Sequence, residues 1–165
     1  MEANAISNTG PIIHLSEINL TETLKIFKTI TIPLEVSKEI KKHNIPIPKN
    51  IKIISIDAQS KNIVNLLTNQ YNLDMGESEA IALTIQTNSD YFLTDDLDAR
   101  ITAKVYNLKV HGTIGIILRA FKEKIINKEL AITKIKEMHS QSSLFITNDL
   151  IEEAIKAIQN YKNSN

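Results

Sequence analysis

The stretch Gly76–Asp98 reads GESEAIALTIQTNSDYFLTDDLD, and its apolar pattern decides the fold class. Glu77–Thr87 favours a helix that is apolar on most of its sides, which is typical of a helix buried against a sheet. Tyr91–Thr94 is a short apolar segment that we interpret as a buried strand, and Asp95–Tyr106 favours a second helix. Helices that alternate with buried strands indicate βαβ units and a parallel sheet.

The same alternation continues on both sides of this stretch. Further strands are predicted at Asn4–Ser7, Ile30–Ile32, Ile51–Ile56 and Leu108–Val110. Further helices are predicted with Pro11 in the first turn, at Thr21–Lys28, at Pro33–Lys42 and from Asp57 to about Asn69. From Thr113 onward the sequence predicts only helices, the last of them from Asn148 to about Tyr161.

These elements predict a three-layer α/β/α fold with a central, mainly parallel sheet and a helical C-terminal extension. A length of 165 residues suits one domain. We therefore expect a single domain over residues 1–165, with its core at about 3–125 and its C-terminal helices at about 126–162.

Charge and composition narrow the function. The 19 basic and 19 acidic residues cancel, so the chain lacks the cationic excess of a general nucleic-acid binder. If it handles nucleic acid, we expect a local basic patch, a bound cation or a partner to supply the positive charge. The absence of Cys excludes disulfides and thiolate metal sites. Because the sequence has neither a signal-peptide pattern nor a long apolar stretch, we expect a cytoplasmic protein with no membrane partner.

Polar side chains gather where three predicted elements meet one edge of the sheet. Ligands bind parallel α/β sheets at the carboxyl ends of the strands. The residues expected there are Asn8 and Thr9 after the first strand, Glu77 and Glu79 in the first turn of the buried helix, and Asp95, Asp96 and Asp98 after Tyr91–Thr94. Oxygen ligands of this kind suit Mg²⁺ or Mn²⁺.

Each of these groups also has a structural interpretation. Acidic residues in a first helical turn are favoured by the helix dipole, by roughly 0.3–1 kcal/mol each. Asn8, close to Gly10 and Pro11, is a common turn residue. His14 and His111 lie in no metal-ligand spacing and are interpreted as packing or surface residues. Only the expected meeting of the three groups at one sheet edge favours a functional site.

Three segments in order resemble the motifs of PIN-domain proteins. Ser7–Leu15 (SNTGPIIHL) resembles their opening motif, Met75–Leu83 (MGESEAIAL) their central acidic helix, and Leu93–Arg100 (LTDDLDAR) their Thr-x-Asp-x-Asp segment. Together with Val110–Gly115 (VHGTIG), they are similar to a subgroup of short prokaryotic PIN proteins related to the VapC toxins of toxin–antitoxin pairs. The resemblance covers roughly residues 4–125.

The resemblance implies metal-dependent hydrolysis of RNA phosphodiesters. Carried over by position, it implies catalytic roles for Glu77, Asp96 and Asp98, metal binding by Asn8, Glu77, Asp96 and Asp98, and supporting roles for Thr9, Glu79, Thr94 and Asp95. Glu79 is an alternative to Glu77 as the central acid. Asn8 stands where the family has its first acid, which lowers the expected metal affinity because an amide brings no charge.

Two other interpretations stay open. A catalytically weak PIN domain would bind RNA or a protein partner without cleavage, and Asn8 favours that possibility. Alternatively, the acidic cluster would only cap helices in an interaction module. The resemblance also implies an inhibitory antitoxin protein as a partner. A homodimer is expected because a neutral enzyme would benefit from joining basic patches such as Lys38, Lys41 and Lys42.

Overall fold

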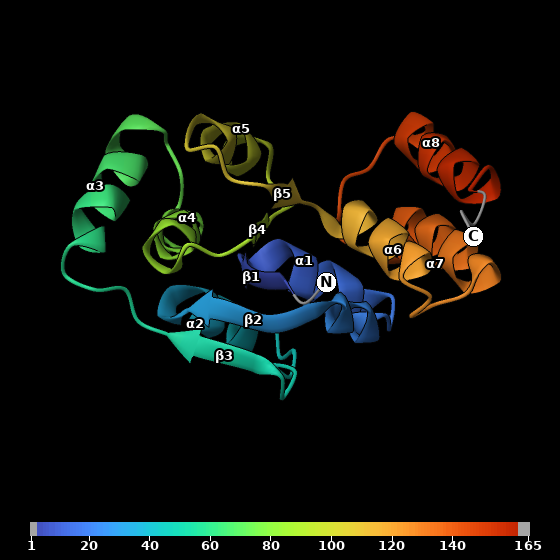
Figure 1. The fold of residues 1–165 in the computed structure, drawn as a ribbon, viewed down its shortest axis with the longest axis horizontal. Helices are drawn as coiled ribbons and strands as arrows, with labels where there is room; N and C mark the ends of the chain where they lie inside the picture. The colour runs from blue at the N-terminus through green and yellow to red at the C-terminus, as the bar shows by residue number, and fades with distance from the viewer. Residues whose placement is uncertain (1–2, 162–165) are drawn as a thin grey trace.

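The computed structural model describes residues 3–161 and has a central five-stranded sheet (Figure 1). The strands are β1 (Ala3–Ser7), β2 (Phe27–Pro33), β3 (Ile51–Ile54), β4 (Tyr91–Leu93) and β5 (Val110–His111). They lie in the order β3-β2-β1-β4-β5, and each neighbouring pair is parallel. The predicted parallel sheet is therefore confirmed.

Helices cover both faces of the sheet, which confirms the three-layer α/β/α fold. They are α1 (Thr9–Glu17), the 3₁₀ helix η1 (Thr21–Ile26), α2 (Leu34–Lys42), α3 (Ser60–Gln70), α4 (Met75–Thr87), α5 (Leu97–Val105), α6 (Thr113–Lys122), α7 (Lys128–Gln141) and α8 (Asn148–Gln159). Consecutive residues Ala5 and Ile6 of β1 belong to different buried clusters, because successive strand side chains point to opposite faces. The Ile6 cluster is formed with α3, α4 and α5. Within residues 3–161, no helix is both long enough and apolar enough to cross a membrane.

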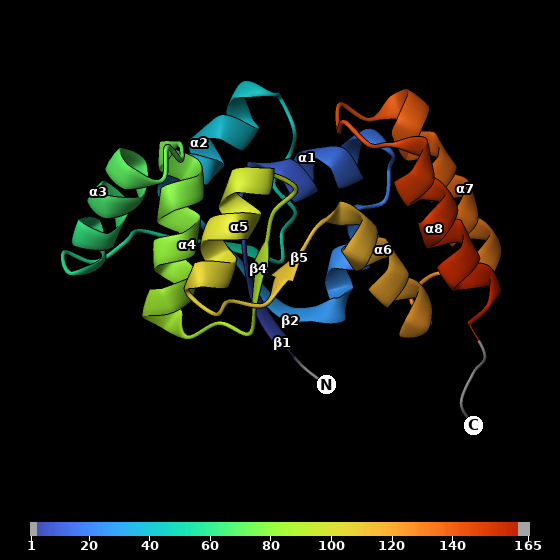
Figure 2. The same ribbon diagram turned by 90° about the horizontal axis from the view of Figure 1, so that it is seen from above.

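The Ala5 cluster extends into the C-terminal helices. It joins α1, α2 and α6 to buried side chains of α7 and α8, including Ile151, Ala154 and Ile158. Figure 2 shows α7 and α8 side by side next to α6, at the opposite end of the molecule from α3. The apolar face of the last helix, α8, therefore packs on its own chain.

Several predicted boundaries differ from the structure, among them that of the strand predicted at Ile51–Ile56, which ends at Ile54. The predicted helix Thr21–Lys28 ends early as a 3₁₀ turn, because Phe27 is buried and pairs with Ala3 as the first residue of β2. Helix α4 begins at Met75, two residues before the predicted Glu77, because Asp74 caps it. The last strand begins two residues later and ends one residue later than expected, at Val110–His111.

The strand order of the sheet reverses at the junction of β1 and β4. Strands β2 and β3 extend from one side of β1, whereas β4 and β5 extend from the other. The register aligns Ser7 with Leu93, and the backbone N–H of Asn8 donates to the carbonyl of Leu93 at 3.0 Å. The loops after β1 and β4 therefore start side by side, at the topological switch point where α/β proteins bind ligands.

Candidate active site

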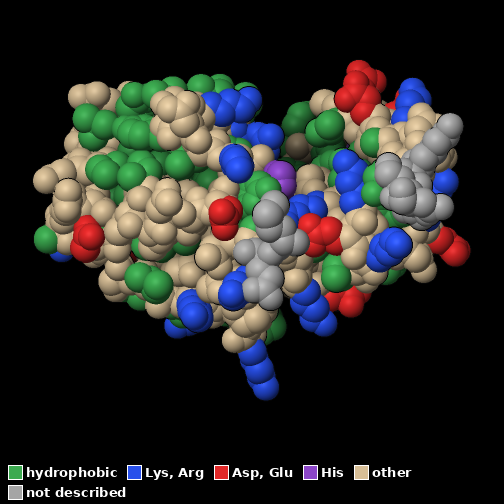
Figure 3. All heavy atoms as spheres, in the orientation of Figure 1, with side chains coloured by type: hydrophobic (Ala, Val, Ile, Leu, Met, Phe, Trp, Pro, Cys, Tyr) green, Lys and Arg blue, Asp and Glu red, His purple; other side chains and the backbone are tan. Residues whose placement is uncertain are grey.

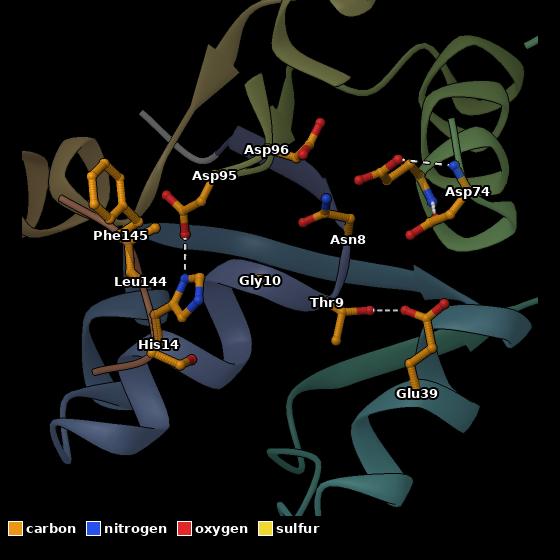
Figure 4. Close-up of a pocket in the computed structure, with 12 residues that line it drawn as sticks. Asn8, Thr9, Gly10, His14, Glu39, Asp74, Asp95, Asp96, Leu144 and Phe145 are labelled. Atoms are coloured by element: carbon orange, nitrogen blue, oxygen red, sulfur yellow. Dashed lines mark hydrogen bonds and ion pairs between the residues drawn. The ribbon is translucent and has the colours of Figure 1, made fainter. Parts of the chain in front are cut away.

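An open cavity of about 320 Å³ lies at this switch point, and we call it the acidic cavity (Figure 4). Its lining includes five carboxylates, those of Glu39, Asp74, Glu77, Asp95 and Asp96. Its remaining lining residues are Asn8, Thr9, Gly10, His14, Ser143, Leu144 and Phe145. The cavity therefore combines residues from α1, α2, α4, the β4–α5 loop and the loop between α7 and α8.

Asn8 lies at the base of the acidic cavity and is only 5% exposed. Its amide nitrogen donates to the hydroxyl of Thr94 at 2.7 Å, and Thr94 is itself fully buried. The amide oxygen Oδ1 is buried and has no hydrogen-bond partner among residues 3–161. A buried polar atom without a partner costs roughly 1–3 kcal/mol, so this oxygen is poised to accept a ligand.

Glu77 enters the cavity from the first turn of α4, where it forms a capping box with Asp74. The backbone N–H of Glu77 donates to Asp74 Oδ1 at 2.7 Å, and the backbone N–H of Asp74 donates to Glu77 Oε2 at 3.0 Å. Burial raises the pKa of Glu77 to about 7, against the hydrogen bond from Asp74, and the charges of Asp74, Asp96 and Glu39 raise it further. Negative charges therefore surround Glu77, and a bound cation would offset their repulsion.

Glu39 is a cavity residue that the sequence did not reveal. It lies on α2, accepts a hydrogen bond from the Thr9 hydroxyl, and has its pKa raised chiefly by burial. It approaches α4 closely at Gly76, since a Cβ at that position would lie 2.7 Å from Glu39 Oε1. Because this approach depends on tertiary packing, no local pattern could indicate it. Asp74, by contrast, stands three residues before Glu77, a spacing typical of a capping box.

Asp95 and Asp96 follow β4 but have different surroundings. Asp96 Oδ1 accepts the backbone N–H of Ala99 at 2.8 Å and so caps α5, and its side chain stays exposed at the cavity. Asp95 accepts from the backbone N–H of Thr113 at 2.7 Å and from its hydroxyl at 2.5 Å. Asp95 also contacts Nδ1 of His14 at 2.7 Å, so its oxygens are engaged within the protein.

Two predicted acids do not line the acidic cavity. Asp98 is exposed on the first turn of α5 and is not part of the lining. Glu79 turns toward the start of α2, where its Oε2 accepts the backbone N–H of Glu35 at 3.2 Å. His14, which the sequence suggested was a packing or surface residue, does line the cavity.

The fold and the cavity define an α/β protein with an acidic site at the carboxyl edge of its sheet. A family model described as PIN domain matches residues 4–160, and the chain belongs to this family. The PIN domain is a nuclease-type fold, and its members generally depend on divalent metal. The resemblance of the sequence motifs is thus confirmed for the family, whereas the VapC-like subgroup remains a prediction. The chain matches no curated protein.

The donor set of the cavity fits a hard divalent cation. Asn8 Oδ1 has no partner in the described part of the chain, and the other ligand candidates, Glu77 and Asp96, also present oxygen. Across the described residues 3–161, however, no three acidic, His or Cys side chains are grouped so that they could hold a metal ion. Carboxylates repel one another when no cation is bound. Metal binding would therefore require some of these side chains to turn toward the cavity.

Proposed function

We propose that this protein is a divalent-metal-dependent endoribonuclease that hydrolyses RNA phosphodiester bonds, with Mg²⁺ or Mn²⁺ as its cofactor. The observation that carries the proposal is the buried Asn8 Oδ1, which no described residue pairs with, at the base of a cavity lined by five carboxylates. Capping alone leaves both features unexplained, because helix caps require neither carboxylates from separate elements in one cavity nor a buried oxygen without a hydrogen-bond partner.

Asn8, Glu77 and Asp96 are the proposed metal-binding residues. A divalent cation bound there would polarise the phosphodiester and offset negative charge that develops during hydrolysis. Thr94 orients the Asn8 amide by accepting its N–H at 2.7 Å. The pKa of Glu77 is about 7 without metal, and a bound cation would favour its ionised form, so its proposed role is that of a carboxylate ligand. Asp98 lies outside the cavity lining, so its predicted role has no geometric support.

The charge of the cavity explains why a cation would be needed for RNA to approach. A phosphodiester is repelled by carboxylates such as Glu39 and Asp74, and the chain as a whole carries no net positive charge. Neutralisation of the acids by metal would make the cavity attractive to phosphate. Substrate binding and metal binding are therefore expected to depend on each other.

The proposal extends to a toxin-like role with an antitoxin protein and a homodimer as partners. A homodimer is supported by α5, on which Ile101 and Val105 are 54% and 60% exposed. Their spacing of four residues places them on one helix face, a pattern typical of helix association. Sedimentation of the wild type and of Ile101→Glu tests the dimer, since a charge there should produce monomers.

The function is tested by incubating the purified protein with structured RNA and either Mg²⁺ or Mn²⁺, with EDTA and Asp96→Asn as controls. Cleavage that requires metal and disappears in Asp96→Asn would establish the activity. Thermal stability is followed in parallel, because a bound cation raises the melting temperature by mass action. Stabilisation by metal without cleavage would favour a PIN domain that binds RNA or a partner only. No response to metal would favour helix capping.

A further inference from the structure

Phe145 is the most exposed large hydrophobic residue described, at 91%, and it lines the acidic cavity. It belongs to the loop between α7 and α8. Its neighbour Ile146 is 7% exposed within the core, Leu144 packs against the same core, and the backbone N–H of Ser143 donates to Glu17 Oε2 at 2.7 Å. These contacts anchor the loop on both sides of Phe145, so the aromatic ring is held outward by the packing of its neighbours.

An apolar groove continues from the acidic cavity at this residue. It encloses about 510 Å³, and it shares Asp95, Leu144 and Phe145 with the acidic cavity. Its apolar walls come from α5, α6 and α8 and include Leu97, Ile114, Leu118 and Leu150. Figure 3 shows a hollow between the part of the molecule that carries α5 and the C-terminal helices. Phe145 therefore stands between an acidic cavity and an apolar groove.

The groove also carries a cationic side chain close to the acidic cavity. Arg100 lines it and donates from Nη1 to the carbonyl of Thr94 at 3.3 Å. Gly112 permits this approach, because a Cβ there would lie 2.8 Å from both Arg100 Nη1 and Asp95 Oδ1. A fixed guanidinium beside an apolar wall and an exposed ring suits a planar group that is linked to a phosphate.

We propose that the groove binds one unstacked nucleobase of the RNA, with Phe145 as its stacking platform, next to the phosphodiester held at the acidic cavity. This inference rests on the proposed ribonuclease function. Exposed aromatic side chains stack on bases of any sequence, and each stacked base contributes roughly 1–3 kcal/mol. Bases in a duplex are stacked and paired, so the groove selects single-stranded segments such as loops and ends.

A tryptophan introduced at the groove reports on base stacking directly, because the chain contains no Trp. The probe is a short single-stranded oligoribonucleotide with Mg²⁺, and the protein is Phe145→Trp combined with Asp96→Asn to prevent cleavage. We expect the oligonucleotide to quench the Trp emission, and a duplex of the same sequence to leave it unchanged. The matched control is Ile125→Trp in the same background, at a 42% exposed residue outside the groove, which should not be quenched.

Cleavage kinetics give an independent measurement. Phe145→Ala should raise the KM for single-stranded RNA roughly tenfold, the loss expected for one stacked base, whereas Phe145→Tyr should retain the wild-type value. Absence of Trp quenching, although a filter-binding measurement shows that the oligonucleotide binds, would overturn the base site. Self-association of the protein through the groove would also overturn the base site. Quenching by single strands in a protein whose wild type never cleaves would leave the groove proposal standing and reject the hydrolytic function.

Discussion

Asn8 and Thr94 are joined side chain to side chain across the β1–β4 junction, with Asn8 Nδ2 donating to Thr94 Oγ1 at 2.7 Å. This bond fixes which end of the amide faces the acidic cavity. Figure 4 shows Asn8 in the midst of the cavity carboxylates, with Asp95 and Asp96 on one side and Asp74 and Glu39 on the other. The position at which the sequence resemblance places the family's first acid thus presents a neutral oxygen in a fixed orientation.

Asn8→Asp should strengthen cation binding, because it adds a negative charge where Oδ1 has no partner among residues 3–161. The fold should tolerate the change, since the Thr94 hydroxyl can donate as well as accept and can reverse the bond. We expect at least about tenfold tighter Mn²⁺ binding by calorimetry, equivalent to roughly 1.4 kcal/mol. Asn8→Ala is the control, and it should bind Mn²⁺ more weakly than the wild type. Equal affinity in all three proteins would remove Asn8 from the metal site.

Asp96→Asn should reduce cleavage by about 100-fold or more, a typical loss when a group that stabilises the transition state is removed. The variant should remain folded, because Asn is as good a helix cap as Asp and can still accept the Ala99 N–H. Asp98→Asn is the matched comparison, two residues further on and outside the cavity lining. We expect near wild-type rates from it. An equal loss in both variants would show that Asp98 also takes part.

Much of the fold could be predicted because its signals are local. The buried pattern of Glu77–Thr87 and the apolar Tyr91–Thr94 each indicate their own element, and the parallel sheet follows from their alternation. The start of β2 was missed because Phe27 is extended only through its pairing with Ala3. Tertiary contacts of this kind override local propensity.

The candidate site was predicted only in part, for the same physical reason. Asn8, Glu77 and Asp96 could be found because each follows or begins an element whose end lies at the sheet edge. Glu39 could not, because it reaches the cavity from the middle of α2. Phe145 comes from a loop about 50 residues beyond Asp96, and only the packing of α7 and α8 brings it to the cavity.

Glu77→Gln should change how stability depends on pH. The pKa of Glu77 is about 7 in the folded protein and 4.5 without perturbation, so the folded state binds more protons between these values. The contribution of this group to metal-free stability therefore falls as pH rises from about 4.5 to about 7. In urea unfolding with EDTA, the variant should be the more stable protein at pH 8, by on the order of 1 kcal/mol after allowance for solvent screening.

The difference in stability between the wild type and Glu77→Gln should change at pH 5 and on addition of a cation. At pH 5 the wild-type carboxyl is mostly protonated, so the two stabilities should converge. Gln at this position can still accept the Asp74 N–H, so the capping box survives. Adding Mg²⁺ at pH 8 should stabilise the wild type more than the variant. A constant difference at both pH values would show that Glu77 is not the titrating group.

Gly76→Ala tests whether Glu39 supports the cavity from α2. The new methyl group would lie 2.7 and 2.9 Å from the two Glu39 oxygens, so this carboxylate must move while the backbone of α4 stays in place. We expect roughly tenfold weaker Mn²⁺ binding, as for loss of a group that orients metal ligands, read from the cation dependence of the melting temperature. Gly115→Ala is the matched helical control, because its methyl group would meet only His111 at 3.8 Å or more. Both substitutions raise helix propensity, so this property does not distinguish them. Weaker Mn²⁺ binding in Gly76→Ala alone would assign the effect to Glu39. Unchanged Mn²⁺ binding in both variants would exclude Glu39 from the site.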